Sequence, residues 1–232
     1  MASLPDFSSI EAALTRDIPL HQLEARLRPT DGNNGWDDAS RGGFLAPEES
    51  LLTVVRRDYD TLTTLGMNYV QMAKLAADGI TQTRKEGMRG PIGNFIARHW
   101  RPLVRFDRKQ FTAVQVGSLG RQSCPWECNR RDAFGYNPWG GSYVYVKESG
   151  KNDEILERYL EAMDGGEESF SSASARRTGI GFGGMDRAIY LSAFLVITDL
   201  TPHLIASHYF FQGEAAYRTD PRKLIEFVHS AD

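Results

Sequence analysis

The chain has 232 residues, of which 41% are hydrophobic and 25% charged, with a net charge of −3. This is the composition of a globular protein, and the acidic balance argues against general affinity for nucleic acid but not against a local basic patch. The N-terminus lacks a basic region followed by an apolar core, and no apolar run reaches the roughly 20 residues that span a bilayer. We therefore expect a cytoplasmic protein, not bound to a membrane, whose two cysteines are free thiols.

The N-terminal third predicts helices. Two short ones are expected at 9–15 and 20–27, followed by a loop at 30–43 that is rich in turn-forming residues. Pro47, with two glutamates after it, predicts the start of a longer helix that ends near Gly66.

Asn68 predicts the cap of a further helix that runs from Tyr69 to about Asp78 and ends at Gly79. With Gly79 as a turn glycine, this region invites a helix-turn-helix interpretation. That interpretation is disfavoured, because Lys85 would fall where the motif needs an apolar residue.

The rest of the chain predicts a central sheet and two C-terminal helices. Strands are expected at 111–119, 143–148 and 187–198, the last of which is almost continuously apolar. Thr201 and Pro202 predict the start of a helix that reaches about Gln212 and ends at Gly213.

Asp220 and Pro221 repeat this cap-and-proline pattern and predict the start of a last helix. The expected fold class is α+β: a central mixed or antiparallel sheet of few strands, with N-terminal and C-terminal helices packed on it. We expect residues 1–232 to form a single domain with loops at 30–43 and 164–184.

The first candidate site is the run Cys124-Pro125-Trp126-Glu127-Cys128, which follows a predicted strand. If Cys124 caps a helix, the helix amides favour its thiolate and lower its pKa, as in a catalytic nucleophile. Such a nucleophile needs a base, and His203, His208 and His99 are available. The alternative is that the cysteine is buried as a small hydrophobic residue.

The second candidate is a zinc site formed by Cys124, Cys128, His203 and His208, whose C-x3-C and H-x4-H spacings occur in Cys2His2 sites. Residues five apart on a helix point about 140° apart. We therefore expect both histidines to face one ion only if the helix is distorted or ends between them. Otherwise one histidine is buried in the core and the other is exposed.

An acid–base pair is a third candidate. Asp199 and His203 are four residues apart across the predicted helix start, so they could hydrogen-bond to one another. Together with Cys124 they form the catalytic set that an enzyme would need, although the same pairing also serves as a structural cap.

Two segments are candidate contact surfaces. Residues 84–109 carry eight Lys or Arg against two acidic residues, and residues 164–184 are rich in Gly and Ser. The glycine pattern at 179–184 resembles a dinucleotide fingerprint but lacks the required strand before it and helix after it, which disfavours nucleotide binding. The arginines expected to bind an acidic group are Arg98, Arg101, Arg105, Arg176 and Arg177.

Two functions therefore remain open. The favoured one is a binding or interaction protein that uses residues 84–109 and 164–184 to contact a protein or an acidic small-molecule ligand, with nucleic acid disfavoured. The other is an enzyme with either a Cys–His nucleophile pair or a zinc cofactor between Cys124/Cys128 and His203/His208. The binding function is favoured because no catalytic motif is complete.

Overall fold

The computed structural model describes residues 3–28, 43–89, 103–108, 111–148, 150–151, 154, 194–215 and 218–229. Within these ranges, four strands form one antiparallel sheet in the order β1-β2-β3-β4. The strands are β1 (Leu103–Arg108), β2 (Phe111–Ser123), β3 (Trp139–Glu148) and β4 (Leu195–Thr198). The sheet and its helices confirm the predicted α+β class.

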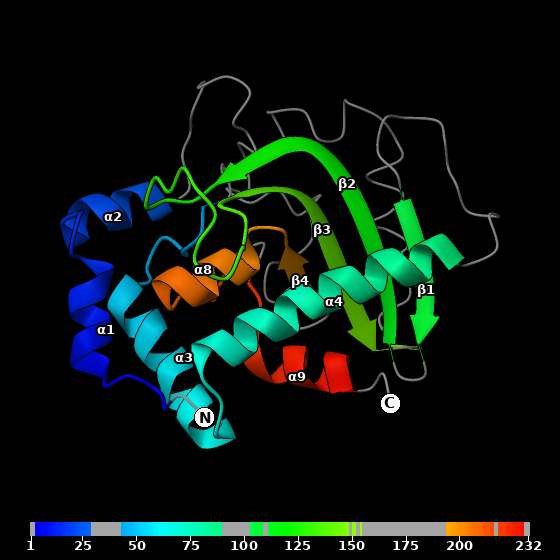
Figure 1. Cartoon of the computed structure of the whole chain (residues 1–232), viewed down its shortest axis with the longest axis horizontal. Helices are drawn as coiled ribbons and strands as arrows, with labels where there is room; N and C mark the ends of the chain where they lie inside the picture. The colour runs from blue at the N-terminus through cyan, green and yellow to red at the C-terminus, as the bar shows by residue number, and fades with distance from the viewer. Residues whose placement is uncertain are drawn as a thin grey trace.

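Three helices precede α4 and the sheet: α1 (Phe7–Leu14), α2 (Leu20–Leu27) and α3 (Leu51–Leu65). The long α4 (Tyr69–Arg89) leads towards the sheet, and α8 (Thr201–His208) and α9 (Pro221–His229) follow β4. In Figure 1, α1 to α3 gather at one end of the molecule, and α4 crosses in front of the strands. The close contacts of α4 with α8, α9, β1, β2 and β4 make it the element that joins the helical end to the sheet.

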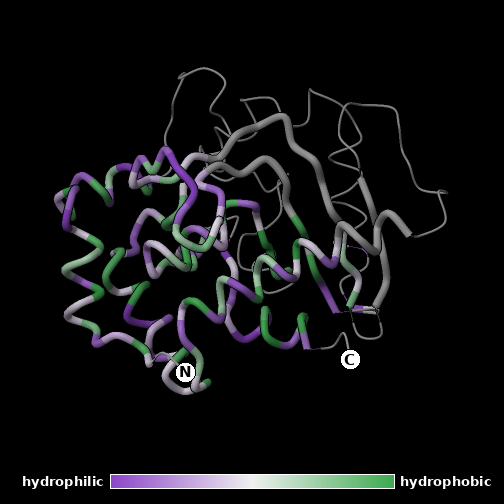
Figure 2. Tube along the Cα trace, viewed as in Figure 1, coloured by the Kyte–Doolittle hydropathy of each residue, from purple (hydrophilic) through white to green (hydrophobic). Residues whose placement is uncertain are grey.

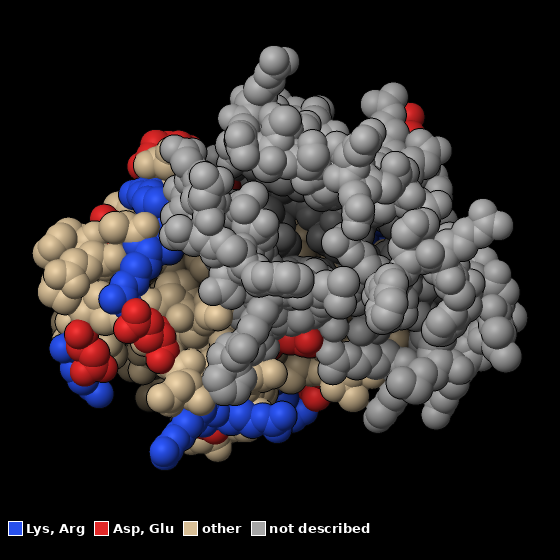
Figure 3. All heavy atoms as spheres, turned by 90° about the horizontal axis from the view of Figure 1, so that it is seen from above, with Lys and Arg blue, Asp and Glu red and all other residues tan. Residues whose placement is uncertain are grey.

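The hydrophobic core extends from the helical end, where Leu23 and Leu51 are buried, to the place where α4 and α9 meet the sheet. Val144 and Ile197 of the sheet are buried together with Leu224 and Phe227 of α9. Figure 2 shows hydrophobic positions recurring along α4 and α9 where the two helices approach one another. None of the described helices is long and apolar enough to cross a membrane. On the face drawn in Figure 3, acidic and basic side chains lie interspersed wherever the residues are described.

The predicted end of a helix at Gly79 was wrong, because α4 continues through it to Arg89. The glycine serves close packing instead. A Cβ atom there would lie 3.3 Å from Ile197 Cδ1 and 3.4 Å from Phe227 Cε1. A continuous helix leaves no turn at Gly79, so it also excludes the helix-turn-helix interpretation. The predicted end at Gly66 is confirmed, since this residue is left-handed with φ 64°.

Two other predicted helix boundaries were also wrong. Helix α3 begins at Leu51 and not at Pro47, because Ser50 caps it by accepting the Thr53 amide. Helix α8 begins at Thr201, one residue before the predicted start, with Leu200 as its N-cap, and the Thr201 amide donates to the Thr198 hydroxyl. It ends at His208, far short of Gln212.

Of the predicted strands, 111–119 and 143–148 are confirmed with longer bounds, while β4 covers only the last part of 187–198. Strand β1 was not predicted. Residues 187–193, the loop at 164–184 and nearly all of the loop at 30–43 lie outside the described residues.

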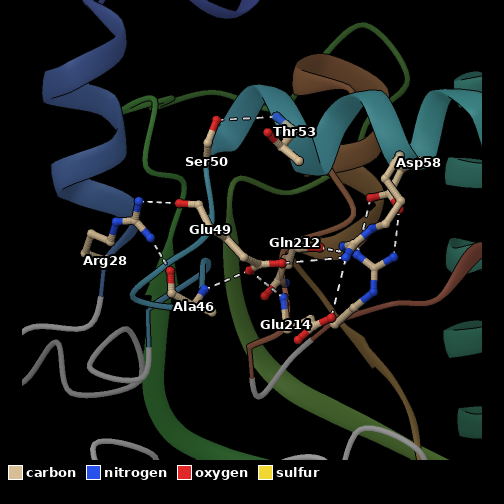
Figure 4. A network of polar contacts seen from close by, with 10 residues as sticks. Arg28, Ala46, Glu49, Ser50, Thr53, Asp58, Gln212 and Glu214 are labelled. Atoms are coloured by element: carbon tan, nitrogen blue, oxygen red, sulfur yellow. Dashed lines mark hydrogen bonds and ion pairs between the residues drawn. The ribbon is translucent and has the colours of Figure 1, made fainter.

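A polar network fastens the C-terminal segment to α3 (Figure 4). The guanidinium of Arg218 donates to both carboxylate oxygens of Asp58, at 2.7 and 3.3 Å, and Asp58 is fully buried. The Glu49 carboxylate accepts the amides of Ala46 at 2.9 Å and Glu214 at 2.8 Å. Because Glu49 packs this tightly, a Cβ atom on Gly213 would collide with it. Close approach, not a helix end, therefore explains this glycine.

Candidate metal centre

The two cysteines lie on a tight turn directly after β2. The Cys124 amide donates to the Pro138 carbonyl, and the Glu127 amide donates to the Cys124 carbonyl at 2.9 Å. Glu127 has a left-handed backbone with φ 57°. Cys124 does not cap a helix, and it is buried, as the alternative interpretation expected. The chain makes a single turn, which returns Cys128 to the neighbourhood of Cys124.

The two histidines both come from α8. The centroids of their rings are 5.1 Å apart, so His203 and His208 do converge, and the expectation that they point apart was wrong. The angle of about 140° describes only the directions in which the side chains leave the helix. Rotation about the two side-chain torsions of each histidine brings the rings together. His208 is also the last helical residue, followed by Tyr209 in the left-handed region with φ 54°.

The four side chains form one cluster. One potential ligand atom from each of Cys124, Cys128, His203 and His208 lies within 4.8 Å of the other three. The His208 Nε2 atom is 3.3 Å from both the Cys124 and Cys128 sulfurs. The four residues that the sequence pattern singled out therefore lie close enough to hold a metal ion.

Trp126 packs against the face of the His208 ring. The indole and imidazole rings are stacked, with centroids 4.2 Å apart and planes 10° apart. The indole Nε1 donates to the Leu14 carbonyl at 3.1 Å, which fixes the indole to the end of α1. The cluster is therefore packed against the N-terminal helices.

The two thiols are inequivalent. The pKa of Cys128 is lowered by the hydrogen bond from the Cys124 thiol and further by His208. The pKa of Cys124 is raised by that same hydrogen bond and by burial. A helix cap at Cys124 would have lowered its pKa; instead the hydrogen bond to Cys128 and burial outweigh the backbone amides of Trp126 and Cys128, which act in the lowering direction. Burial lowers the pKa of His208 and so favours the neutral imidazole, which is the form that binds metals.

His203 is 1% exposed, and within the described residues neither of its ring nitrogens makes a hydrogen bond. The carboxylate that faces it belongs to Asp132, whose Oδ2 is 3.4 Å from His203 Nδ1. Asp132 follows Cys128 in the β2–β3 connection, and no role was predicted for it. A lone Asp in a polar loop carries no spacing signal, so only the folded structure identifies it.

The remaining predicted residues do not join the cluster or cannot be placed. Asp199 is half-buried in the turn between β4 and α8, and its catalytic role stays a prediction. The structure does not describe the side chain of His99. Nor does it describe the side chains of the five arginines expected to bind an acidic partner, which are Arg98, Arg101, Arg105, Arg176 and Arg177. The binding function of 84–109 and 164–184 also stays a prediction.

Comparison of the chain with family models, curated proteins and solved structures finds no match. Its function is therefore inferred from the residues of the site.

Proposed function

We propose that this chain is a zinc-binding protein, in which one ion held by Cys124, Cys128, His203 and His208 joins the β2–β3 connection to α8. The observation that carries this proposal is the convergence of the four ligand atoms to within 4.8 Å of one another. Two of these residues lie at the end of a strand, and the other two lie on a helix about 75 positions later in the chain. Cys124 and His203 are buried, and Cys128 and His208 are half-buried; removing such polar groups from water is costly unless they find partners.

The chemistry of the donors supports zinc over other metals. Two sulfur and two imidazole donors form one of the common sets for structural Zn²⁺, whereas Mg²⁺ and Ca²⁺ prefer oxygen ligands. Zinc–sulfur bonds of about 2.3 Å and zinc–nitrogen bonds of about 2.0 Å in a tetrahedron imply S···N separations of about 3.5 Å. The two S···N separations of 3.3 Å at His208 are close to that value.

The number of ligands favours a structural role for the ion. Four protein donors complete the tetrahedron, whereas catalytic zinc sites usually keep one position for water or substrate. The ion would fasten α8 and the turn after β2 to one another, and the stack of Trp126 on His208 would extend this connection to α1. The zinc centre would thus stabilise the packing of α8 and the β2–β3 connection on the N-terminal helices.

The Cys–His nucleophile is the second candidate, and one observation favours a modified form of it. Cys128 is half-buried, has a lowered pKa and lies 3.3 Å from an imidazole nitrogen, whereas Cys124 is buried and has a raised pKa. If the protein is an enzyme of this class, the nucleophile is Cys128 and not Cys124.

Metal analysis of the purified protein distinguishes the zinc site from the Cys–His nucleophile. The zinc proposal predicts about one zinc per chain by elemental mass spectrometry, and its loss in Cys124→Ser and His208→Gln. The exposed His229 gives a matched control, because His229→Gln should keep the metal. Metal-free wild-type protein that cannot be loaded with zinc, and whose Cys128 reacts rapidly with iodoacetamide at neutral pH, would reject zinc and favour the nucleophile.

A further inference from the structure

Asp132 lies beside the cluster without belonging to its four ligands. Its side chain is only 10% exposed, and both of its carboxylate oxygens are engaged. Oδ1 accepts the amides of Phe134 and Tyr136, each at 2.9 Å, which folds the loop around the carboxylate. Oδ2 accepts the Ser207 hydroxyl at 3.0 Å and faces His203 Nδ1 at 3.4 Å. This carboxylate is therefore fixed in place by its own loop and directed at α8.

We propose that Asp132 is a positioning residue of the metal centre, which accepts a hydrogen bond from Nδ1–H of His203 and so directs Nε2 of His203 to the ion. The inference rests on the proposed zinc site. In metal sites, a ligating histidine usually donates its other ring N–H to a carboxylate or carbonyl, and this contact fixes the tautomer and the orientation of the ring.

The buried state of His203 requires such a partner. Both ring nitrogens are buried without a hydrogen bond among the described residues, and leaving buried polar groups unpaired costs free energy. A metal on Nε2 and a carboxylate on Nδ1 would satisfy both. The separation of 3.4 Å is slightly longer than the 2.7–3.2 Å range of N–H···O hydrogen bonds. A small shift that shortens this contact and aligns the N–H with the carboxylate would make the bond.

Asp132 also acts on the second histidine. Ser207, which donates to the same Oδ2 atom, directly precedes His208 on α8. Asp132 itself follows Cys128 by four residues, so the loop that supplies a sulfur ligand also supplies the carboxylate. One side chain thereby connects the cysteine loop to both ends of the helical segment that carries the nitrogen ligands.

The test is the zinc affinity of Asp132→Asn, measured by competition with a chromophoric chelator. The asparagine carbonyl can still accept the Phe134 and Tyr136 amides, but its NH₂ group cannot accept Nδ1–H. We expect zinc binding to weaken about 10- to 100-fold, which is typical when an outer-shell partner is lost. Glu127→Gln is the matched control, because it removes an exposed charge next to Cys128 without removing a contact to a histidine. It should leave the affinity unchanged.

A spectroscopic measurement separates positioning from general destabilisation. Long-range ¹H–¹⁵N correlation spectra of zinc-loaded wild type should show His203 with its proton on Nδ1 and its metal on Nε2. The proposal is overturned if the proton is on Nε2, if Asp132→Asn binds zinc as wild type does, or if Glu127→Gln weakens binding equally. If Asp132→Asn fails to fold, the wild-type spectrum still tests the proposal, because it shows which ring nitrogen of His203 carries the proton. Wild-type protein that takes up no zinc would overturn the proposed function itself, and this inference with it.

Discussion

The imidazole of His208 lies flat on the indole of Trp126, with ring centroids 4.2 Å apart and an angle of 10° between the planes. The same indole donates to the Leu14 carbonyl at 3.1 Å and packs edge-on against the ring of Phe210, with centroids 5.8 Å apart and an angle of 63° between the planes. The tryptophan therefore connects a proposed metal ligand to the first helix of the chain.

Replacement of Trp126 tests this connection. Trp126→Ala removes the stack and leaves a cavity, so we expect a loss of about 2–4 kcal/mol in the free energy of unfolding, measured by urea denaturation. Trp126→Phe keeps an aromatic ring but loses the hydrogen bond to Leu14, which should cost about 1 kcal/mol. Equal losses in the two variants would mean that the stacked ring contributes nothing.

The ion pair between Arg218 and Asp58 should be essential for stability. Arg218→Met leaves the buried Asp58 carboxylate with only the longer ion pair to Arg57, at 3.7 Å, which is expected to cost about 3–5 kcal/mol. Lys74→Met is the matched control, because Lys74 is 70% exposed and its ion pair with Asp78 lies on the surface of α4. It should cost about 1 kcal/mol or less. Similar losses in the two variants, measured by urea denaturation, would contradict the assignment of the buried pair.

Replacement of glycine by alanine should have different effects on stability at Gly66 and at Gly79. Gly66→Ala places a side chain at a left-handed position with open space around it, so backbone strain alone should cost about 1–2 kcal/mol. At Gly79 the backbone is helical, and the gain in helix propensity of about 1 kcal/mol opposes a tight contact with Ile197 and Phe227. Gly79→Ala should therefore change stability by about 1 kcal/mol or less.

A bulkier residue at Gly79 should be far worse. Gly79→Leu forces atoms into the contact between α4, β4 and α9, and overpacking of this kind costs about 1–3 kcal/mol or more. The unfolding temperatures of Gly79→Ala and Gly79→Leu test this prediction. If Gly79→Ala is as damaging as Gly66→Ala and Gly79→Leu is no worse, then α4 ends at Gly79 instead of passing through it.

Removal of zinc should destabilise the whole protein. A ligand that binds only the folded state stabilises it by about 2.7 kcal/mol when its free concentration is 100 times its dissociation constant. We therefore expect a chelator to lower the unfolding temperature of wild type. Cys128→Ser should unfold at one temperature with or without the chelator, because its site is already broken. A chelator effect of equal size in Cys128→Ser would place the stabilising metal elsewhere.

Much of the fold could be predicted because local signals and packing agree. Leu20–Leu27 forms the expected helix, and Asp220 caps α9 as predicted by accepting the amides of Arg222 and Lys223. Strand β1 was missed because Leu103–Arg108 mixes apolar and charged residues within a basic segment, and its strand conformation depends on pairing with β2. The sequence predicts helix α4 only to about Asp78, because glycine commonly ends a helix. The close packing of Gly79 against Ile197 and Phe227, which explains this glycine, exists only in the folded structure.

The four residues of the candidate metal site could be singled out from residue types and spacing, but their convergence could not be predicted. Cys128 and His203 are 75 residues apart (203 − 128), and their proximity depends on how α8 packs against the turn after β2. The contact between Asp132 and His203 could not be predicted either, because it also depends on how α8 packs against the β2–β3 connection. The Asp sits in a loop where it accepts two backbone amides, a pattern that also occurs in ordinary Asx turns.

X-ray absorption at the zinc edge of the purified, zinc-loaded protein tests the central claim most directly, because it reports the ligands that surround the ion. The account predicts a four-coordinate ion with two sulfurs at about 2.3 Å and two nitrogens at about 2.0–2.1 Å. In Cys128→Ser, one of the two sulfurs should disappear from the spectrum. A spectrum of nitrogen and oxygen ligands alone in wild type would contradict the account.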